Sequence, residues 1–102
     1  MLPGDDLRQA YLKHTEQELA EEKAAALRRI VDTLEQLLAD LQVLRARYAV
    51  ACPADKPRLA DRYEAVRERA VEYRWYLRVQ CEAIGIRRHD EFESRFPEPP
   101  AL

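Results

Sequence analysis

The sequence predicts an all-α protein: an antiparallel hairpin of two long helices followed by a short C-terminal helix. Only 2 glycines occur among 102 residues, whereas sheets with several tight turns normally need more. Apolar residues recur at alternating steps of three and four along two long stretches, which is the pattern of helices that pack on helices. The proline-containing segment ACPADKP, residues 51–57, separates the two stretches. We therefore expect one helical domain over residues 5–96 and a Pro-rich flexible tail over residues 97–102.

The first long helix is predicted over about residues 5–51. No glycine or proline interrupts the chain between Gly4 and Pro53. Its apolar stripe is the most regular signal in the sequence and consists of Leu27, Ile30, Leu34, Leu37, Leu41, Leu44 and Tyr48. Val31 and Leu38 lie beside this stripe and widen it, which favours a globular bundle over a bare two-stranded coiled coil.

The N-terminal third of this helix has a less regular pattern. Asp5 or Asp6 is placed to cap the first backbone amides. Thr15 and Glu18 match a capping box, which leaves open a break in the helix near His14. We expect an unbroken helix, because alanine has a high helix propensity and the segment contains Ala20 and the alanine run 24–26.

The second long helix is predicted over about residues 56–84. Pro53 cannot continue the first helix, and Asp55 before Pro57 is placed to cap the next one. The second heptad stripe slips once, at Gln80-Cys81, and consists of Leu59, Tyr63, Val66, Ala70, Tyr73, Leu77 and Ile84. Gly85 can adopt the left-handed conformation that closes a helix, with Ile86 as the usual apolar partner of such an end.

The C-terminal segment is predicted to contain a short helix over about residues 89–95, with Phe92 and Phe96 on one side. Residues 97–102 are expected to form a mobile tail that can be removed with little loss of stability. Their prolines lack amide donors, and the segment has little apolar surface to bury.

A connection of about five residues makes the two long helices antiparallel neighbours. This register places Leu34 opposite Leu77, and we expect a core of Leu34, Leu37, Leu41, Leu44, Tyr63, Val66, Tyr73 and Leu77. The second helix is the shorter one, so the first twenty or so residues of the first helix would extend past it by roughly 30 Å. The apolar residues on this extension need cover from the C-terminal segment or from another copy, and they are Leu7, Tyr11, Leu12 and Leu19.

A second apolar stripe lies on the far side of the second helix. With Leu77 facing the first helix, Val71, Trp75 and Val79 fall within about 60° of the opposite side at 100° per residue. This stripe can pack on the short C-terminal helix, lie among the stems of neighbouring arginines, line a small-molecule groove, or meet a second polypeptide. We expect a second polypeptide, because tryptophan anchors interfaces and exposed apolar stripes are uncommon on monomers.

The charges are nearly balanced, with 17 basic and 19 acidic residues and a pI of about 5.7. No field of one sign would therefore draw the whole protein to nucleic acid or to an anionic membrane. No stretch approaches the roughly 18 uninterrupted apolar residues of a membrane span. We expect a cytoplasmic protein that does not insert into membranes, in which Cys52 and Cys81 stay reduced.

The helices carry candidate residues for two further kinds of site. Arg74 and Arg78 flank the aromatic stretch of the second helix and could contact phosphates, but the neighbouring glutamates cancel the field that nucleic-acid binding needs. The pairs His14 with Glu18 and His89 with Glu93 have a spacing that could place both side chains toward a cation. The ligand pattern of di-iron bundles is absent, and we expect neither a metal nor another cofactor.

Part of the first helix resembles the first helix of the all-helical chorismate mutases. The similar residues are Leu27, Arg28, Asp32, Leu34, Glu35, Leu38, Leu41 and Arg45. The resemblance implies that Arg28 and Arg45 would hold a dicarboxylate substrate. Pro53 interrupts the chain where the helix of that family continues, and no third long helix is predicted here to complete the pocket.

The sequence thus favours a non-enzymatic interaction or scaffold module, a homodimer of hairpins that forms a four-helix bundle. The expected interface residues are Leu7, Tyr11, Leu12, Leu19, Val31, Leu38, Val71, Trp75 and Val79. A heterologous protein partner is a further possibility. The alternatives are a small nucleic-acid-associated regulator and a small helical enzyme of chorismate-mutase-like type. In those cases the ligand-binding candidates are Arg28, Arg45, Arg74 and Arg78.

Overall fold

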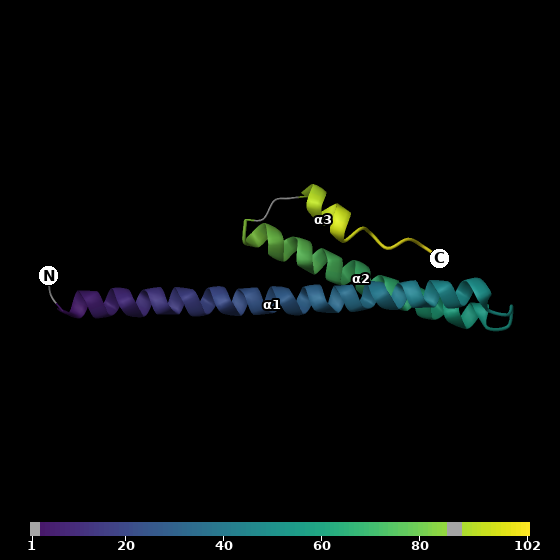
Figure 1. Cartoon of the computed structure of the whole chain (residues 1–102), viewed down its shortest axis with the longest axis horizontal. Coiled ribbons are helices and arrows are strands. Elements are labelled where there is room, and N and C mark those ends of the chain that lie inside the picture. Colours follow the sequence, from purple (N-terminus) through teal and green to yellow (C-terminus); the bar gives the residue numbers. More distant parts are fainter. Residues whose placement is uncertain (1–2, 86–88) are drawn as a thin grey trace.

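The computed structural model describes residues 3–85 and 89–102, with side chains described over 6–85 and 90–102. Three helices follow one another along the chain: α1 (Pro3–Val50), α2 (Lys56–Ala83) and α3 (His89–Arg95). The two long helices pack against each other as an antiparallel hairpin (Figure 1). The predicted all-α hairpin with a short C-terminal helix is confirmed.

Helix α1 is continuous through the position where the capping box suggested a break. The Thr15 hydroxyl donates a hydrogen bond to the Tyr11 carbonyl, with an oxygen-to-oxygen distance of 3.0 Å. This bond to the preceding turn is the usual one for threonine inside a helix, so Thr15 does not act as a cap. The alternative of a break near His14 is wrong. The side chain of Asp5 lies outside the described residues.

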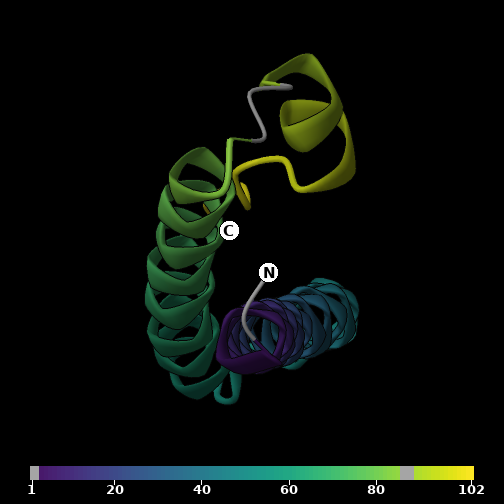
Figure 2. The ribbon, with the colours of Figure 1, turned by 90° about the vertical axis from the view of Figure 1, so that its left-hand side faces the viewer.

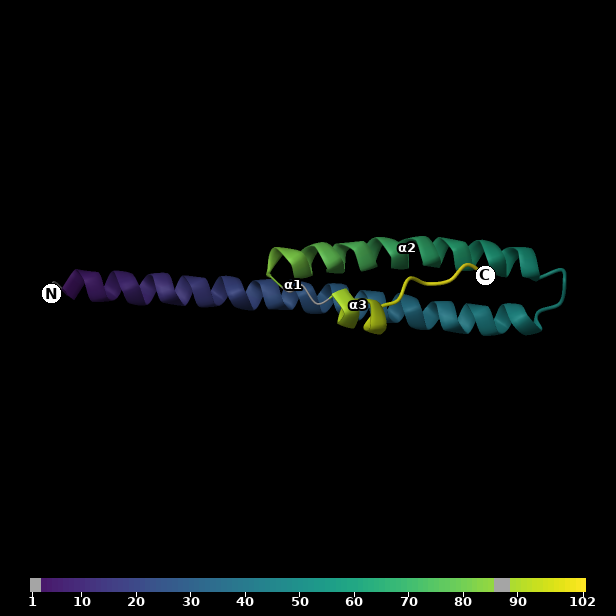
Figure 3. The ribbon, with the colours of Figure 1, turned by 90° about the horizontal axis from the view of Figure 1, so that it is seen from above.

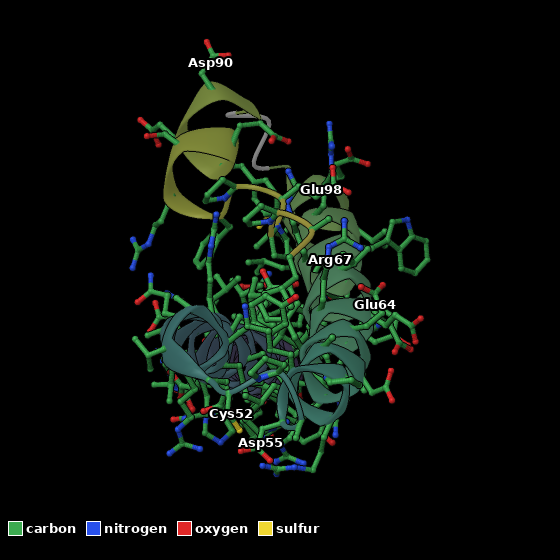
Figure 4. All side chains as sticks on the ribbon, turned by 90° about the vertical axis from the view of Figure 1, so that its right-hand side faces the viewer. Cys52, Asp55, Glu64, Arg67, Asp90 and Glu98 are labelled. Carbon is green, nitrogen blue, oxygen red and sulfur yellow. The ribbon has the colours of Figure 1, made fainter. Side chains whose placement is uncertain are left out.

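Asp55 lies at the N-cap position of α2, in the turn between the long helices, but its side chain does not cap the helix as predicted. Its backbone angles, φ −89° and ψ −19°, are helical, and its side chain makes no capping hydrogen bond. An effective side-chain cap normally has extended angles, so the carboxylate is directed elsewhere. Its Oδ2 accepts a hydrogen bond from Cys52 Sγ at 3.2 Å, and Figure 4 shows both residues at the turn.

The core lies between the two heptad stripes. Leu34 and Tyr63 are the largest fully buried side chains, each 1% exposed, and Ala70 allows the helices to approach closely. The complete buried set is Leu34, Leu37, Leu41, Leu44, Leu59, Tyr63, Ala70, Leu77 and Phe96. Val66 and Tyr73, which we also predicted in the core, are half-buried against it. The burial of both Leu41 and Leu77 supports the predicted register.

Helix α2 ends as the sequence predicts. Gly85 has φ +84°, in the left-handed region. The Ile84 amide donates to the Gln80 carbonyl at 3.2 Å, and the Gly85 amide donates to the Glu82 carbonyl at 3.1 Å. These bonds satisfy two carbonyls of the last turn. Ile86, the expected apolar partner of this end, lies outside the described residues.

The C-terminal segment packs along the hairpin, which differs from the predicted free tail. It runs from α3 back along the pair of long helices (Figure 3). Pro99 is buried, the Tyr63 hydroxyl donates to the Pro100 carbonyl at 2.6 Å, and Arg67 Nε donates to the Pro99 carbonyl at 3.0 Å. Prolines lack an amide donor but keep a carbonyl acceptor. The segment therefore makes packing contacts that the expectation of a mobile tail with little surface to bury did not include.

Helix α3 is attached to α2 through arginine side chains. Arg74 Nε donates to the Phe96 carbonyl at 2.8 Å, and the Arg74 guanidinium also pairs with Glu93. Arg78 Nη1 lies 3.6 Å from Glu93 Oε1. The Arg74 guanidinium lies over the Phe92 ring, 5.4 Å from its centroid. Because Arg74 is mostly buried, these contacts fix α3 on one flank of α2.

Removal of residues 97–102 is expected to lower the melting temperature. The deletion takes away the acceptors of Tyr63 and Arg67, each such bond contributing about 1 kcal/mol. A loss of 1 kcal/mol lowers the melting temperature of a domain this size by roughly 4–8 °C. Thermal unfolding followed by circular dichroism measures the change. Removal of the exposed residues 101–102 alone is the control, and equal melting temperatures for the two deletions would show that the contacts of Pro99 and Pro100 add no stability.

Candidate interaction surfaces

The molecule is far more extended than a compact domain of its length. It measures 79 × 24 × 15 Å, with a radius of gyration of 20.9 Å, whereas a compact chain of this length has a radius near 13 Å. Its accessible surface is 8066 Å², against about 6,000 Å² for a folded monomer of the same mass. The chain therefore exposes roughly 2,000 Å² more than a compact monomer would.

The N-terminal part of α1 has no neighbouring helix among the described residues to cover it. Helix α1 has 48 residues and α2 has 28, so about 20 residues of α1, or roughly 30 Å, extend past the end of α2. Figure 3 shows this part of α1 running clear of every other element. The described side chains from Asp6 to Ala24 are exposed except Thr15, which is half-buried, and the periodic burial of the helix begins at Ala25. We call residues 3–24 the overhang.

The overhang carries four large apolar side chains in solvent. Leu7 and Tyr11 are 73% and 71% exposed, and Leu12 and Leu19 are 50% and 51% exposed. At 100° per residue, Leu12 and Leu19 lie within about 20° of the mean direction of the core leucines of α1. Tyr11 and Leu7 lie about 100° and 140° away from that direction. Leu12 and Leu19 therefore continue the side of α1 on which α2 rests.

A second exposed apolar surface lies on α2, on the side away from α1. It consists of Val71, Trp75 and Val79, and we call it the outer patch. Trp75 is 60% exposed and Val79 is 39% exposed, while Val71 is half-buried. Because α3 is attached beside Arg74 and Arg78, on a flank of α2, it leaves Trp75 in solvent. The alternative in which the C-terminal helix covers Trp75 is wrong.

Carboxylates surround the outer patch. Exposed acidic residues on this side of α2 are Asp61, Glu64, Glu68, Glu72 and Glu82. The Tyr76 hydroxyl donates a hydrogen bond to Glu72. This hydrogen bond and the negative charge of Glu72 raise the pKa of the Tyr76 phenol. The arginines of α2 lie toward its flanks at the same 100° spacing, so the outer side of α2 is apolar in its middle and acidic around it.

A groove of about 440 Å³ lies between α1 and the C-terminal segment. Viewed along the long axis, α1, α2 and the C-terminal segment occupy the three corners of a triangle (Figure 2). The groove is lined by Leu38, Leu41, Gln42, Arg45, Tyr63, Ser94, Arg95, Pro97, Glu98, Pro99 and Pro100. Leu38 thus faces the chain's own C-terminal segment, and Val31 is half-buried against the core. These two interface candidates are partly covered within one copy.

The four arginines proposed as anion-binding residues do not gather in one site. Arg74 and Arg78 both pair with Glu93 of α3. Arg45 lines the groove, whereas Arg28 does not. Arg28 and Arg45 are 17 residues apart on α1, a separation of about 25 Å. A pocket using both arginines, as the chorismate mutase resemblance implies, is therefore not formed within one chain.

The described cysteine and histidine side chains do not come together in a metal-binding or catalytic cluster. Within the described part of the chain, no three His, Cys, Asp or Glu side chains form a group suited to a metal ion. His14 lies 3.0 Å from Glu18, and the side chain of His89 lies outside the described residues. Both cysteines are free thiols, and burial raises the pKa of the Cys81 thiol, which lowers its reactivity.

The described helices contain no segment with the length and apolar character needed to cross a membrane. Comparison of the chain with protein-family models, curated proteins and solved structures gives no match.

Sequence reasoning missed the contribution of the C-terminal segment to these surfaces. Ser94, Arg95 and residues 97–100 form one wall of the groove, although the sequence predicts a flexible tail over residues 97–102. The one available signal was Phe96, an apolar residue directly before the prolines, which is buried and anchors the segment. In Figure 4, Glu98 of this segment lies on the same side of the molecule as Arg67 of α2.

Proposed function

We propose that the protein is a non-enzymatic helical interaction module that self-associates as a homodimer through the faces of its long helices. The observation that carries the proposal is the extra exposed surface of roughly 2,000 Å² relative to a compact monomer. A standard protein interface buries about 800 Å² per partner. The surface in excess is therefore large enough for such an interface.

The chemistry of the exposed surface supports the same proposal. Leu12, Leu19 and Trp75 lie in solvent on two separate helices. Tryptophan is enriched among the residues that dominate binding energy, and burial of apolar surface is worth about 25 cal/mol per Å². Most of the stability of a helix in a protein comes from the packing of its amphipathic face rather than from helix propensity. Contact with a second polypeptide would stabilise the overhang and bury these side chains together.

The nucleic-acid alternative has weaker support. Contacts to phosphate need clustered cationic groups, but Arg74 and Arg78 are paired with Glu93. The outer side of α2, where Trp75 could stack on a base, is surrounded by carboxylates.

A cytoplasmic location remains part of our proposal, because the free thiols Cys52 and Cys81 suit a reducing compartment.

Thermal unfolding at a series of protein concentrations tests the proposed self-association. A homodimer is stabilised by mass action, so its melting temperature rises with protein concentration. We expect the melting temperature to rise clearly between low and high micromolar concentrations. Unfolding is monitored by the helical signal in circular dichroism. A melting temperature that is constant over this range would contradict the proposal, since unimolecular unfolding does not depend on concentration.

A further inference from the structure

We infer that a second copy of this chain places its overhang along the outer patch of α2, and that the exchange is mutual. The two α1 helices would run antiparallel about a twofold axis near the level where α2 ends. This inference rests on the proposed self-association and specifies which surfaces meet. Leu12 and Leu19 of each copy would then pack against Val71, Trp75 and Val79 of the other.

The direction of the side chains favours this contact. Leu12 and Leu19 lie on the same side of α1 as its core leucines, within about 20°. The overhang therefore continues a surface that already holds α2 farther along the same helix, but no helix of its own chain covers it. The outer patch of a second copy is an exposed apolar helix face of the kind that this surface already binds. Leu7 and Tyr11 lie on another side of α1 and stay outside the proposed contact.

The lengths of the two surfaces are compatible. The overhang extends roughly 30 Å past α2, and the outer patch from Val71 to Val79 covers about 12 Å along its helix. A twofold axis near the end of α2 brings each overhang beside the α2 of the other copy. Helix α2 would lie between its own α1 and the overhang of the second copy, with α3 on its flank. This arrangement gives a four-helix cross-section, with the fourth helix supplied by the second copy.

Charge complementarity distinguishes this pairing from the symmetric alternatives. Arg8 and Lys23 lie on the same side of the overhang as Leu12 and Leu19, within about 40° of the core direction. Of the described acidic side chains of the overhang, Glu16 shares this side. The outer side of α2 presents the exposed carboxylates of Glu68 and Glu72 beside the patch, whereas Glu82 already lies 3.9 Å from Arg78 of its own helix. Basic groups of the overhang thus meet acidic groups of α2, a favourable arrangement in an interface.

The two symmetric alternatives bring like charges together. If two overhangs paired antiparallel with Leu12 opposite Leu19, Arg8 of one copy would face Lys23 of the other. If two outer patches paired, their surrounding carboxylates would face each other. Like charges in opposed positions disfavour an interface. Each symmetric pairing would also leave the other exposed apolar surface in solvent.

A mixing experiment with two variants tests the inference. One variant carries Leu12→Glu with Leu19→Glu in the overhang, and the other carries Trp75→Glu in the outer patch. All three side chains are at least half exposed, so each hairpin is expected to keep its fold, which circular dichroism checks. Each variant alone loses both docking contacts and should be monomeric where the wild type is dimeric. Gln17→Glu, at an exposed position on another side of the overhang, is the control and should remain dimeric.

The equimolar mixture is the decisive sample. The Trp75→Glu copy retains an intact overhang, and the doubly substituted copy retains an intact patch, so one of the two contacts can form between them. The mixture should therefore associate about 10-fold or more tightly than either variant alone, measured by sedimentation with one variant fluorescently labelled. A mixture as monomeric as its components would overturn the inference. A Trp75→Glu variant that stays dimeric would indicate overhang-to-overhang pairing, and a Leu12→Glu/Leu19→Glu variant that stays dimeric would indicate patch-to-patch pairing; either overturns it. If the inference fails while the wild type is dimeric, the proposed self-association still holds. If the wild type is monomeric, both the self-association and the inferred contact are wrong.

Discussion

Replacement of Leu34 by alanine is expected to lower the free energy of unfolding by about 2–5 kcal/mol. Leu34 is 1% exposed and lies in the middle of the core between α1 and α2. Truncation removes buried apolar surface and leaves a cavity that two long rigid helices can fill only by shifting their whole interface. Chemical denaturation at fixed protein concentration measures the effect.

Leu7 provides the matched control, because Leu7→Ala removes the same atoms from the same helix. Leu7 is 73% exposed and lies on the side of the overhang that we leave outside the proposed contact. Its replacement is expected to change the stability by no more than about 0.5 kcal/mol. Equal losses for the two variants would contradict the placement of the core at the heptad stripe.

Removal of residues 1–22 is expected to leave a folded hairpin that is monomeric at concentrations where we expect the full chain to be dimeric. The described side chains before Ala25 take no part in the buried core, so the hairpin keeps its packing without them. The deletion removes Leu12 and Leu19, which are the overhang's share of the proposed contact. Circular dichroism checks the fold, and light scattering measures the mass of the particle.

Two other outcomes of this deletion would each be informative. A truncated chain that unfolds as a monomer would mean that the overhang supports its own hairpin, contrary to the exposure of its side chains. A truncated chain that stays dimeric would mean that the interface excludes the overhang. The dimer would then have to use surfaces of residues 23–102.

The sequence was sufficient to predict the hairpin because its signals are repeated and local. Heptad steps run through both long helices, Pro53 interrupts them once, and Gly85 closes α2 in the left-handed conformation. Each of these features acts through neighbouring residues or through a periodic contact with one partner helix. The burial of both Leu34 and Leu77 follows from the same periodicity, because a short turn leaves little freedom in register.

The C-terminal segment could not be predicted in the same way. Its contacts join Tyr63 to Pro100 and Arg67 to Pro99, more than thirty residues apart in the chain. These bonds use backbone carbonyls, which every residue possesses, so they cannot be predicted from the residue types. The cap at Asp55 failed for a related reason: its side chain suits a cap, but its backbone angles are set by the turn between the two prolines.

The candidate surfaces were predictable in part. The amphipathic pattern located Trp75 opposite the core, and the difference in helix length located Leu12 and Leu19 on an uncovered extension. The roles of Arg74 and Arg78 depended on where α3 returns to α2, which the pattern of one helix does not contain. The sequence therefore indicated where apolar surface remains exposed, but not which charges the chain neutralises internally.

Sedimentation equilibrium of the full chain at micromolar concentration is the most direct test of the proposed self-association. The chain has a mass of 12.0 kDa, so a homodimer has twice this mass. We expect the dimeric mass at high micromolar concentration and partial dissociation on dilution. A particle that keeps the mass of 12.0 kDa across the whole concentration range would contradict self-association through the overhang and the outer patch.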